Sequence, residues 1–141
     1  MPSEQHQALL LWGLRSMVKD GYRVEGIDGH VAGWPSTNRL PPPPDLGGVR
    51  PDACGIHEQD EVFGFVEAKT EWDIDNAHTR KQLSHLASLR MDKNGRPCSL
   101  YVAIPRGSAY ALDRVLIDIG LLRAPHVRRL HVPSAFLESG R

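Results

Sequence analysis

The sequence contains only two cysteines, carries no formal net charge and has no long hydrophobic run. Two cysteines cannot form a disulfide framework, and alone they cannot supply a four-thiolate zinc site. The longest apolar run near the start, 8–14, is far too short to span a membrane, and no basic segment of a signal peptide precedes it. We therefore expect a soluble, cytoplasmic protein without a membrane partner.

The length and composition are those of an ordinary globular domain. The chain has 141 residues, of which 40% are hydrophobic and 24% are charged, and this composition excludes extensive disorder. Because compact domains commonly contain about 100–150 residues, we expect residues 1–141 to form a single domain around one core.

The zero net charge conceals an uneven distribution along the chain. Residues 1–78 contain 6 Lys and Arg against 13 Asp and Glu, whereas residues 79–141 contain 11 against 4. This asymmetry favours a cation-binding region beside an anion-binding region. The alternative is that the two halves neutralise each other in the fold.

Local patterns predict three helices and five strands. The first helix begins after a capping Ser3 and ends at Gly21. Its apolar face consists of Leu10, Leu14, Met17 and Val18. The remaining predicted elements are strands at 22–27, 49–57 and 61–69, a helix at 76–90 capped by Asp75, a strand at 99–104, a helix capped by Ser108, and a strand at 127–132. The tail after Pro133 is expected to fray or to dock weakly.

The segment 28–48 reads as a long loop, since it contains several glycines and four consecutive prolines. Long loops in compact domains often carry function, although many are only mobile. Trp34, Asn38 and Arg39 are its candidate ligand contacts.

The order of the predicted elements indicates the fold class. Strands that alternate with helices in the second half of the chain require parallel pairing and crossover helices. We therefore expect an α/β protein, a three-layer α/β/α sandwich around a mixed five-stranded sheet.

The two strands at 49–57 and 61–69 are separated by a short polar turn and predict a β-hairpin. If the turn centres between Gln59 and Asp60, the numbers of opposed residues sum to 119. Asp52 then lies opposite Glu67, and Lys69 lies on the same face of the sheet. The other face carries small side chains that would let a helix pack closely, namely Ala53, Gly55, Val62, Gly64, Val66 and Ala68.

This register has an electrostatic consequence. Opposed residues have Cβ atoms about 4.5–5.5 Å apart, so two carboxylates in these positions require a cation, or one of them must keep a proton. Lys69 supplies one positive charge, and Mg²⁺ would supply two more, with the carbonyl of Ala68 as a third oxygen ligand. The alternative is a surface ion pair at the open end of a hairpin.

The two strands carry the motifs of a known group of enzymes. Residues 50–55 (RPDACG) and 65–70 (FVEAKT) resemble the PD-(D/E)xK nuclease superfamily, which includes restriction endonucleases and archaeal Holliday-junction resolvases. The specific motifs cover about residues 50–90. The resemblance implies a restriction-endonuclease-like fold and hydrolysis of phosphodiester bonds that depends on Mg²⁺, with Mn²⁺ as a substitute.

The resemblance also implies residue roles. Asp52 matches the metal-binding aspartate, Glu67 matches the second acidic ligand, and Lys69 matches the lysine that orients or activates the attacking water. Gln82 is similar to the glutamine that many members carry on the following helix; by itself it would be a solvated helical residue.

Many resolvase-like members also place a glutamate on the first helix, pointing at the metal. Glu4 is the only acidic candidate for this position, and it lies very close to the chain terminus. His6 and Gln7 are the nearby polar alternatives.

We therefore expect the protein to be an Mg²⁺-dependent endonuclease that hydrolyses DNA. Arg80, Lys81 and Arg106, from the basic half of the chain, are expected to contact phosphates. A small nuclease that cuts two strands is also expected to act as a homodimer.

The leading alternative is a non-catalytic module with the same fold that binds nucleic acid or takes part in protein assembly. A small-molecule enzyme or toxin component on another α/β fold would be favoured if Asp52 and Glu67 lay on opposite faces.

Overall fold

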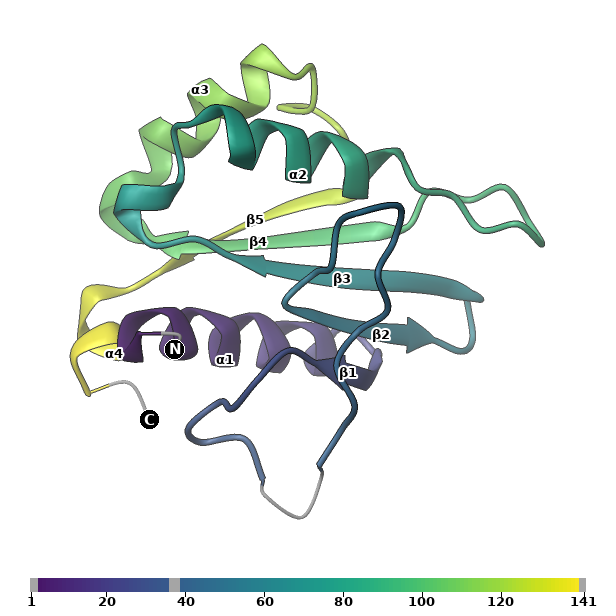
Figure 1. Ribbon diagram of the computed structural model, residues 1–141, viewed down its shortest axis with the longest axis horizontal. Helices are drawn as coiled ribbons and strands as arrows, with labels where there is room; N and C mark the ends of the chain where they lie inside the picture. Colours follow the sequence, from purple (N-terminus) through teal and green to yellow (C-terminus); the bar gives the residue numbers. More distant parts are fainter. Residues whose placement is uncertain (1–2, 36–38, 140–141) are drawn as a thin grey trace.

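The computed structural model describes residues 3–35 and 39–139 of the chain (Figure 1). The strands are β1 (Arg23–Ile27), β2 (Ala53–His57), β3 (Val62–Ala68), β4 (Ser99–Pro105) and β5 (Val127–Val132). The helices are α1 (Glu4–Lys19), α2 (Ala77–Ser88), α3 (Ala109–Asp118) and α4 (Ser134–Ser139), with short 3-10 helices η1 (Glu71–Asp73) and η2 (Arg106–Ser108). All predicted helices and strands are present within a few residues of their expected bounds.

The five strands form one mixed sheet in sequence order, β1-β2-β3-β4-β5. Strands β1, β2 and β3 pair antiparallel, whereas β3, β4 and β5 pair parallel. The predicted buried strand 99–104 is confirmed as β4, which has a parallel neighbour on each side. The predicted mixed five-stranded sheet is therefore confirmed.

The predicted hairpin register is also confirmed. Strand β2 pairs with β3 so that Ala53 lies opposite Val66 and Cys54 lies opposite Phe65. Successive side chains of a strand point to opposite faces, so this pairing places the small residues of both strands on one face. That face is covered by α1, whose Leu10, Leu14 and Met17 belong to the same buried cluster as Ala53 and Val66.

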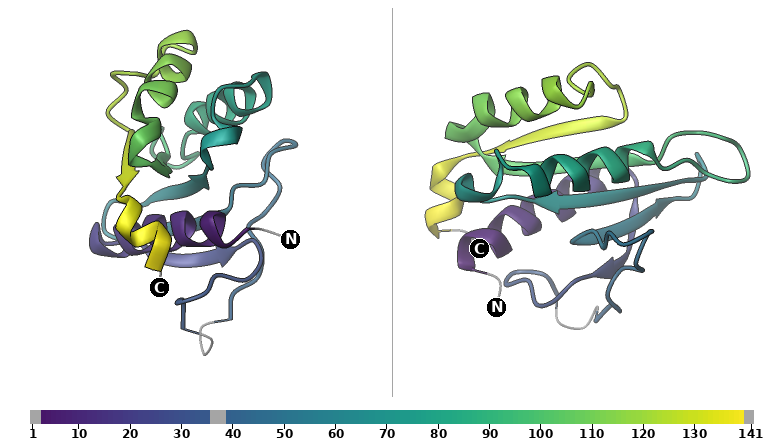
Figure 2. Two further views of the ribbon diagram at one scale, coloured as in Figure 1. Left: turned by 90° about the vertical axis from the view of Figure 1, so that its left-hand side faces the viewer. Right: turned by 45° about the horizontal axis from the view of Figure 1, so that its top comes forward.

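The other face of the sheet is covered by α2 and α3. Both helices are crossovers between consecutive parallel strands, and crossovers of one hand that proceed in one direction place their helices on the same face. Leu83 and Leu86 of α2 and Leu112 of α3 share a buried cluster with Phe65 and Val102 of the sheet. Figure 2 shows α2 and α3 on one side of the sheet and α1 with α4 on the other.

Close packing of α1 requires glycine at the contact with β3. A Cβ added to Gly13 would lie 2.5 Å from Cγ1 of Val66, and Val66 is fully buried. The Cβ atom of any other residue would therefore force the helix away from the sheet.

Three local expectations differ from the structure. Asp75 does not cap α2: the side chain of Asn76 accepts the N–H of Thr79 at 2.7 Å, while Asp75 pairs with Arg80 at 2.8 Å. Ser108 does precede α3, but its side chain makes no capping hydrogen bond. Val18 was expected on the buried face of α1 and is instead 50% exposed.

The tail after Pro133 forms α4, which docks on α1. The ring of Phe136 meets the ring of Trp12 edge-to-face with centroids 4.9 Å apart. The guanidinium of Arg15 lies 5.8 Å from the centroid of the same Phe136 ring. In the part of the chain that the structure describes, no helix has the length and apolar character needed to cross a bilayer.

Candidate metal centre and its surroundings

Asp52 and Glu67 lie at the edge of the sheet where β2 begins and β3 ends. The N–H of Asp52 donates to the carbonyl of Val66 at 3.0 Å, which ties the residue before β2 to β3. The N–H of Lys69 donates to the carbonyl of Ala103 at 3.0 Å, which extends the parallel ladder beyond β3. Backbone hydrogen bonds to a neighbouring strand therefore position Asp52 and Lys69, and Glu67 lies within β3 itself.

The two carboxyl groups are linked through the main chain of the neighbouring strand. The N–H of Asp52 donates to Oε1 of Glu67 at 3.2 Å, and the N–H of Ala68 donates to Oδ2 of Asp52 at 2.8 Å. Each acid thus accepts a hydrogen bond from the strand that carries the other. The expectation that both acids lie on one face, and not on opposite faces, agrees with this geometry.

Glu67 is an unusual carboxyl group because only 2% of its surface is exposed. Burial, and then the charge of Asp52, raise its pKa to about 8, and the nearby positive charge of Lys69 does not offset these two effects. The surroundings of Glu67 therefore favour its protonated form, one of the two outcomes expected for opposed acids. Without a further cation, Glu67 keeps its proton at neutral pH.

Lys69 is held between the acidic pair and α2. Its Nζ lies 3.8 Å from Oε2 of Glu67 and donates a short hydrogen bond to Oε1 of Gln82. The glutamine that the family motif indicates therefore contacts the lysine. Helix α2 presents Gln82 to the site because the fully buried Leu83 and Leu86 fix the rotation of the helix against the sheet.

His6, and not Glu4, brings α1 to the acidic pair. Nε2 of His6 lies 3.3 Å from Oδ2 of Asp52, and this contact raises the pKa of His6. Glu4 is exposed in the first turn of α1 and makes none of the contacts described for this site. The spacing of four residues between His6 and the buried Leu10 is the sequence signal that places His6 on the inner face.

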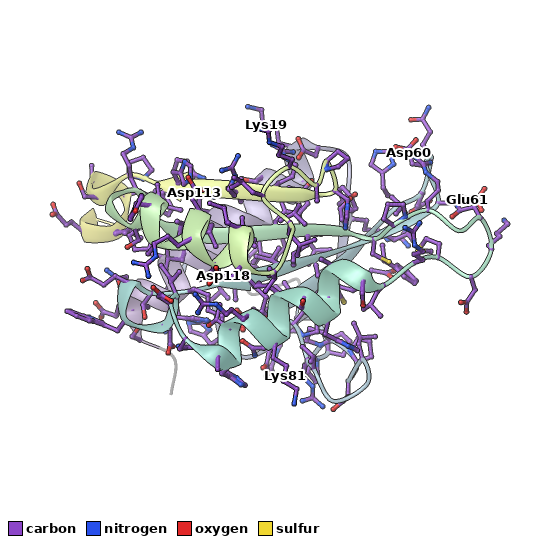
Figure 3. The ribbon with its side chains drawn as sticks, turned by 90° about the horizontal axis from the view of Figure 1, so that it is seen from above. Lys19, Asp60, Glu61, Lys81, Asp113 and Asp118 are labelled. Atoms are coloured by element: carbon purple, nitrogen blue, oxygen red, sulfur yellow. The ribbon has the colours of Figure 1, made fainter. Side chains whose placement is uncertain are left out.

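The three predicted phosphate-binding cations have different surroundings. Arg80 donates to Asp118 at 2.7 Å and pairs with Asp75 at 2.8 Å, so its charge links α2 to α3. Lys81 and Arg106 are exposed. Figure 3 shows Lys81 on the outer side of α2, away from Asp118.

The oxygen atoms of the site suit a hard divalent cation. The hydrogen bonds described above end on Oδ2 of Asp52 and Oε1 of Glu67, so the second oxygen of each carboxylate and the carbonyl of Ala68 are the candidate ligands. Within residues 3–35 and 39–139, no group of three or more His, Cys, Asp or Glu side chains is arranged to hold a metal ion. Mg²⁺ commonly binds proteins through one or two carboxylates and otherwise through water and substrate oxygens.

Of the three loop candidates, Trp34 and Arg39 line a cavity beside β1, whereas Asn38 lies outside the described residues.

Comparisons with family models, with curated proteins and with solved structures gave no match for this chain.

Proposed function

We propose that this chain is a divalent-metal-dependent nuclease that hydrolyses phosphodiester bonds of DNA. The observation that carries the proposal is the convergence of Asp52, Glu67 and Lys69 at the edge of two paired strands, with the pKa of Glu67 raised to about 8. A buried Glu67 beside a half-buried Asp52, next to a lysine, suits an Mg²⁺ ion and a phosphate group. The resemblance of the surrounding motifs to PD-(D/E)xK nucleases, and a restriction-endonuclease-like fold, are part of the same proposal.

The carboxylates of Asp52 and Glu67, with the carbonyl of Ala68, would hold the ion. When bound, a divalent cation polarises a phosphoryl oxygen and lowers the pKa of a coordinated water. The reaction also requires a group that stabilises charge on the phosphate and a group that orients the water, and Lys69 supplies both. The ammonium group of Lys69 stabilises negative charge that develops on the phosphate, and it positions the attacking water.

Gln82 acts through Lys69. A lysine side chain has four rotatable bonds, so an unrestrained ammonium group would occupy many positions. The hydrogen bond to Oε1 of Gln82 and the 3.8 Å approach to Glu67 restrict it to one. This restriction places the positive charge in advance at the point where the reaction requires it.

Exposed cations would hold the rest of the DNA. Lys81 on α2 and Arg106 directly after β4 are both exposed, and β3 and β4 end at the same edge of the sheet because they are parallel. Contacts from such residues to phosphates give affinity that does not depend on base sequence and that falls with salt.

The predicted homodimer belongs to this proposal as well, and light scattering in solution would test it.

A cleavage assay tests the function. Linear, nicked, flap and four-way-junction DNA are incubated with the protein and Mg²⁺, Mn²⁺ or EDTA. We expect cleavage only with a metal, and we expect Asp52→Asn and Lys69→Met each to reduce the rate about 100-fold or more. Asp92→Asn and Lys19→Met are matched controls, because both residues are exposed and lie outside the site.

Two results would overturn the proposal. One is cleavage by Asp52→Asn and Lys69→Met at the rate of the parent protein. The other is retention of DNA in a gel-shift assay without any metal-dependent product, which would identify the chain as a binding module.

A further inference from the structure

A cavity of about 640 Å³ lies beside the carboxyl end of β1. It is lined by Ile27, by residues of the segments 28–31 and 34–35, and by Arg39, Leu40, Pro42 and Arg50. In Figure 1 the chain between β1 and β2 passes below α1 before it returns to the sheet. The volume lies within the range of about 300–1,000 Å³ that is usual for small-ligand sites.

The walls of the cavity are fixed by hydrogen bonds to the rest of the fold. The N–H of Ile27 donates to the carbonyl of Pro41 at 3.0 Å, and the N–H of Ala32 donates to Oε1 of Gln7 on α1 at 3.1 Å. Trp34 and Leu40 pack against the buried cluster beneath α1. The cavity is therefore formed before any ligand arrives.

The side chains around the cavity combine an aromatic wall with unpaired positive charge. Trp34 contributes an indole whose Nε1 is buried and has no hydrogen-bond partner among the described residues. Arg39 and Arg50 are exposed, and none of the ion pairs in the described part of the chain involves them. Asp28 supplies the one acidic side chain of the lining. A planar ring that stacks on indole and carries an anionic group matches these features.

One residue that lines the cavity, Asp28, is hydrogen-bonded to the backbone of Asp52. The N–H of Asp28 donates to the carbonyl of Asp52 at 2.8 Å, and Arg50 is two residues before Asp52 in the chain. The cavity lining and Asp52 therefore lie on adjoining stretches of backbone. A DNA strand with one phosphate at Asp52 would bring a neighbouring nucleotide toward the cavity.

We propose that this cavity binds one unpaired nucleotide of the DNA substrate next to the phosphate that is cleaved, with its base on Trp34 and its phosphate near Arg39 and Arg50. The inference rests on the proposed nuclease function, because it takes DNA to be the substrate. A base in a duplex is paired at its edge and stacked on both faces, so it cannot enter a cavity without leaving the helix. Single-stranded or branched DNA is therefore the preferred substrate class.

Binding measured without cleavage tests the inference. A labelled single-stranded oligonucleotide and the duplex of the same sequence are titrated with the protein in EDTA and followed by fluorescence anisotropy. We expect the parent protein to bind the single strand about tenfold more tightly than the duplex at equal salt, the size of one stacked base. Trp34→Leu and Arg50→Gln should remove this preference and leave duplex binding unchanged.

The controls separate a folding defect from the loss of a binding site. Arg50 is exposed, so Arg50→Gln leaves the fold intact even if Trp34→Leu destabilises it, and Arg123→Gln is the matched change of another exposed arginine. Deoxyadenosine monophosphate should compete with the single strand, whereas inorganic phosphate at the same concentration should not. If inorganic phosphate competed as well as deoxyadenosine monophosphate, the cavity would bind anions without recognising a base, and this result would overturn the inference.

Failure of the inference can be distinguished from failure of the proposed function. Equal affinity for single strand and duplex, or an unchanged preference in Arg50→Gln, overturns the inference even if metal-dependent cleavage is observed. A preference that depends on Trp34 and Arg50 supports the inference even if the chain binds DNA without cutting it.

Discussion

The main-chain N–H of Asp52 donates a hydrogen bond to the side chain of Glu67 across 3.2 Å, so the backbone of one acid positions the carboxyl group of the other. This contact depends on the register of β2 against β3, and a shift of one residue would move the two acids to opposite faces of the sheet. The chemistry proposed for this site is therefore determined by strand pairing.

The raised pKa of Glu67 predicts how stability depends on pH. In the absence of metal, the folded chain keeps the Glu67 proton up to about pH 8, whereas an unfolded glutamate releases it near 4.5. Because the folded state binds more protons in this interval, the stability contributed by Glu67 is fully present below pH 4.5 and is lost as the pH rises through 8. The loss is on the order of a few kcal/mol.

Urea denaturation in EDTA at several pH values measures this effect. Glu67→Gln is neutral throughout and should show a flatter dependence of the free energy of unfolding on pH. The pKa of His6 is also raised, so His6 acts in the same direction, and His6→Asn should retain the slope contributed by Glu67. Equal slopes for Glu67→Gln and the parent protein would contradict the burial argument.

Removal of the Gln82 side chain should impair catalysis through Lys69. Gln82→Ala leaves the Nζ of Lys69 without its hydrogen bond from α2, so we expect a kcat about 10- to 100-fold lower with little change in KM. Ser84→Ala on the same helix is the control, because Ser84 is exposed. An unchanged kcat in Gln82→Ala would show that the lysine is positioned by other groups.

Arg80 is held in ion pairs, whereas its neighbour Lys81 is exposed, so substitutions of these two residues should have different effects. Arg80→Gln should lower the melting temperature, because it removes the ion pairs that link α2 to α3, and it should leave DNA affinity nearly unchanged. Lys81→Gln should weaken DNA binding and reduce the slope of log affinity against log salt by about 1. Salt titrations of DNA affinity compare the two variants, and a larger loss of affinity in Arg80→Gln would reverse their assigned roles.

The contact between α1 and β3 can be tested by one methyl group. Gly13→Ala should destabilise the fold by about 1–3 kcal/mol, because the new Cβ meets the fully buried Val66, and this exceeds the gain of about 1 kcal/mol in helix propensity. Gly107→Ala enters open space and should change stability by less than about 0.5 kcal/mol. Similar melting temperatures for both variants would contradict the close packing of α1.

The sheet could be predicted from the sequence because its signals are local. The polar turn between β2 and β3 sets the hairpin register, and the uninterrupted apolar run 99–104 marks the central strand. The approach of Lys69 to Glu67 follows from this register, and the placement of Gln82 followed from resemblance to a family motif.

The parts that could not be predicted depend on contacts between distant segments. Asp75 is a residue type that often caps helices, but its carboxylate pairs with Arg80 and Arg114. Asn76 caps α2 in its place. The docking of α4 requires Trp12 and Phe136 to meet across the fold. Position in the chain does not distinguish Glu4 from His6, whereas the rotation of α1 on the sheet brings His6 into contact with Asp52.

Calorimetric titration with Mn²⁺ at about pH 8 tests the central claim most directly, since it measures binding at the acidic pair without reference to any substrate. The account predicts one cation per chain for the parent protein and for Asp92→Asn, with affinity reduced about tenfold or more in both Asp52→Asn and Glu67→Gln. Binding of equal strength in Asp52→Asn and the parent protein would contradict it.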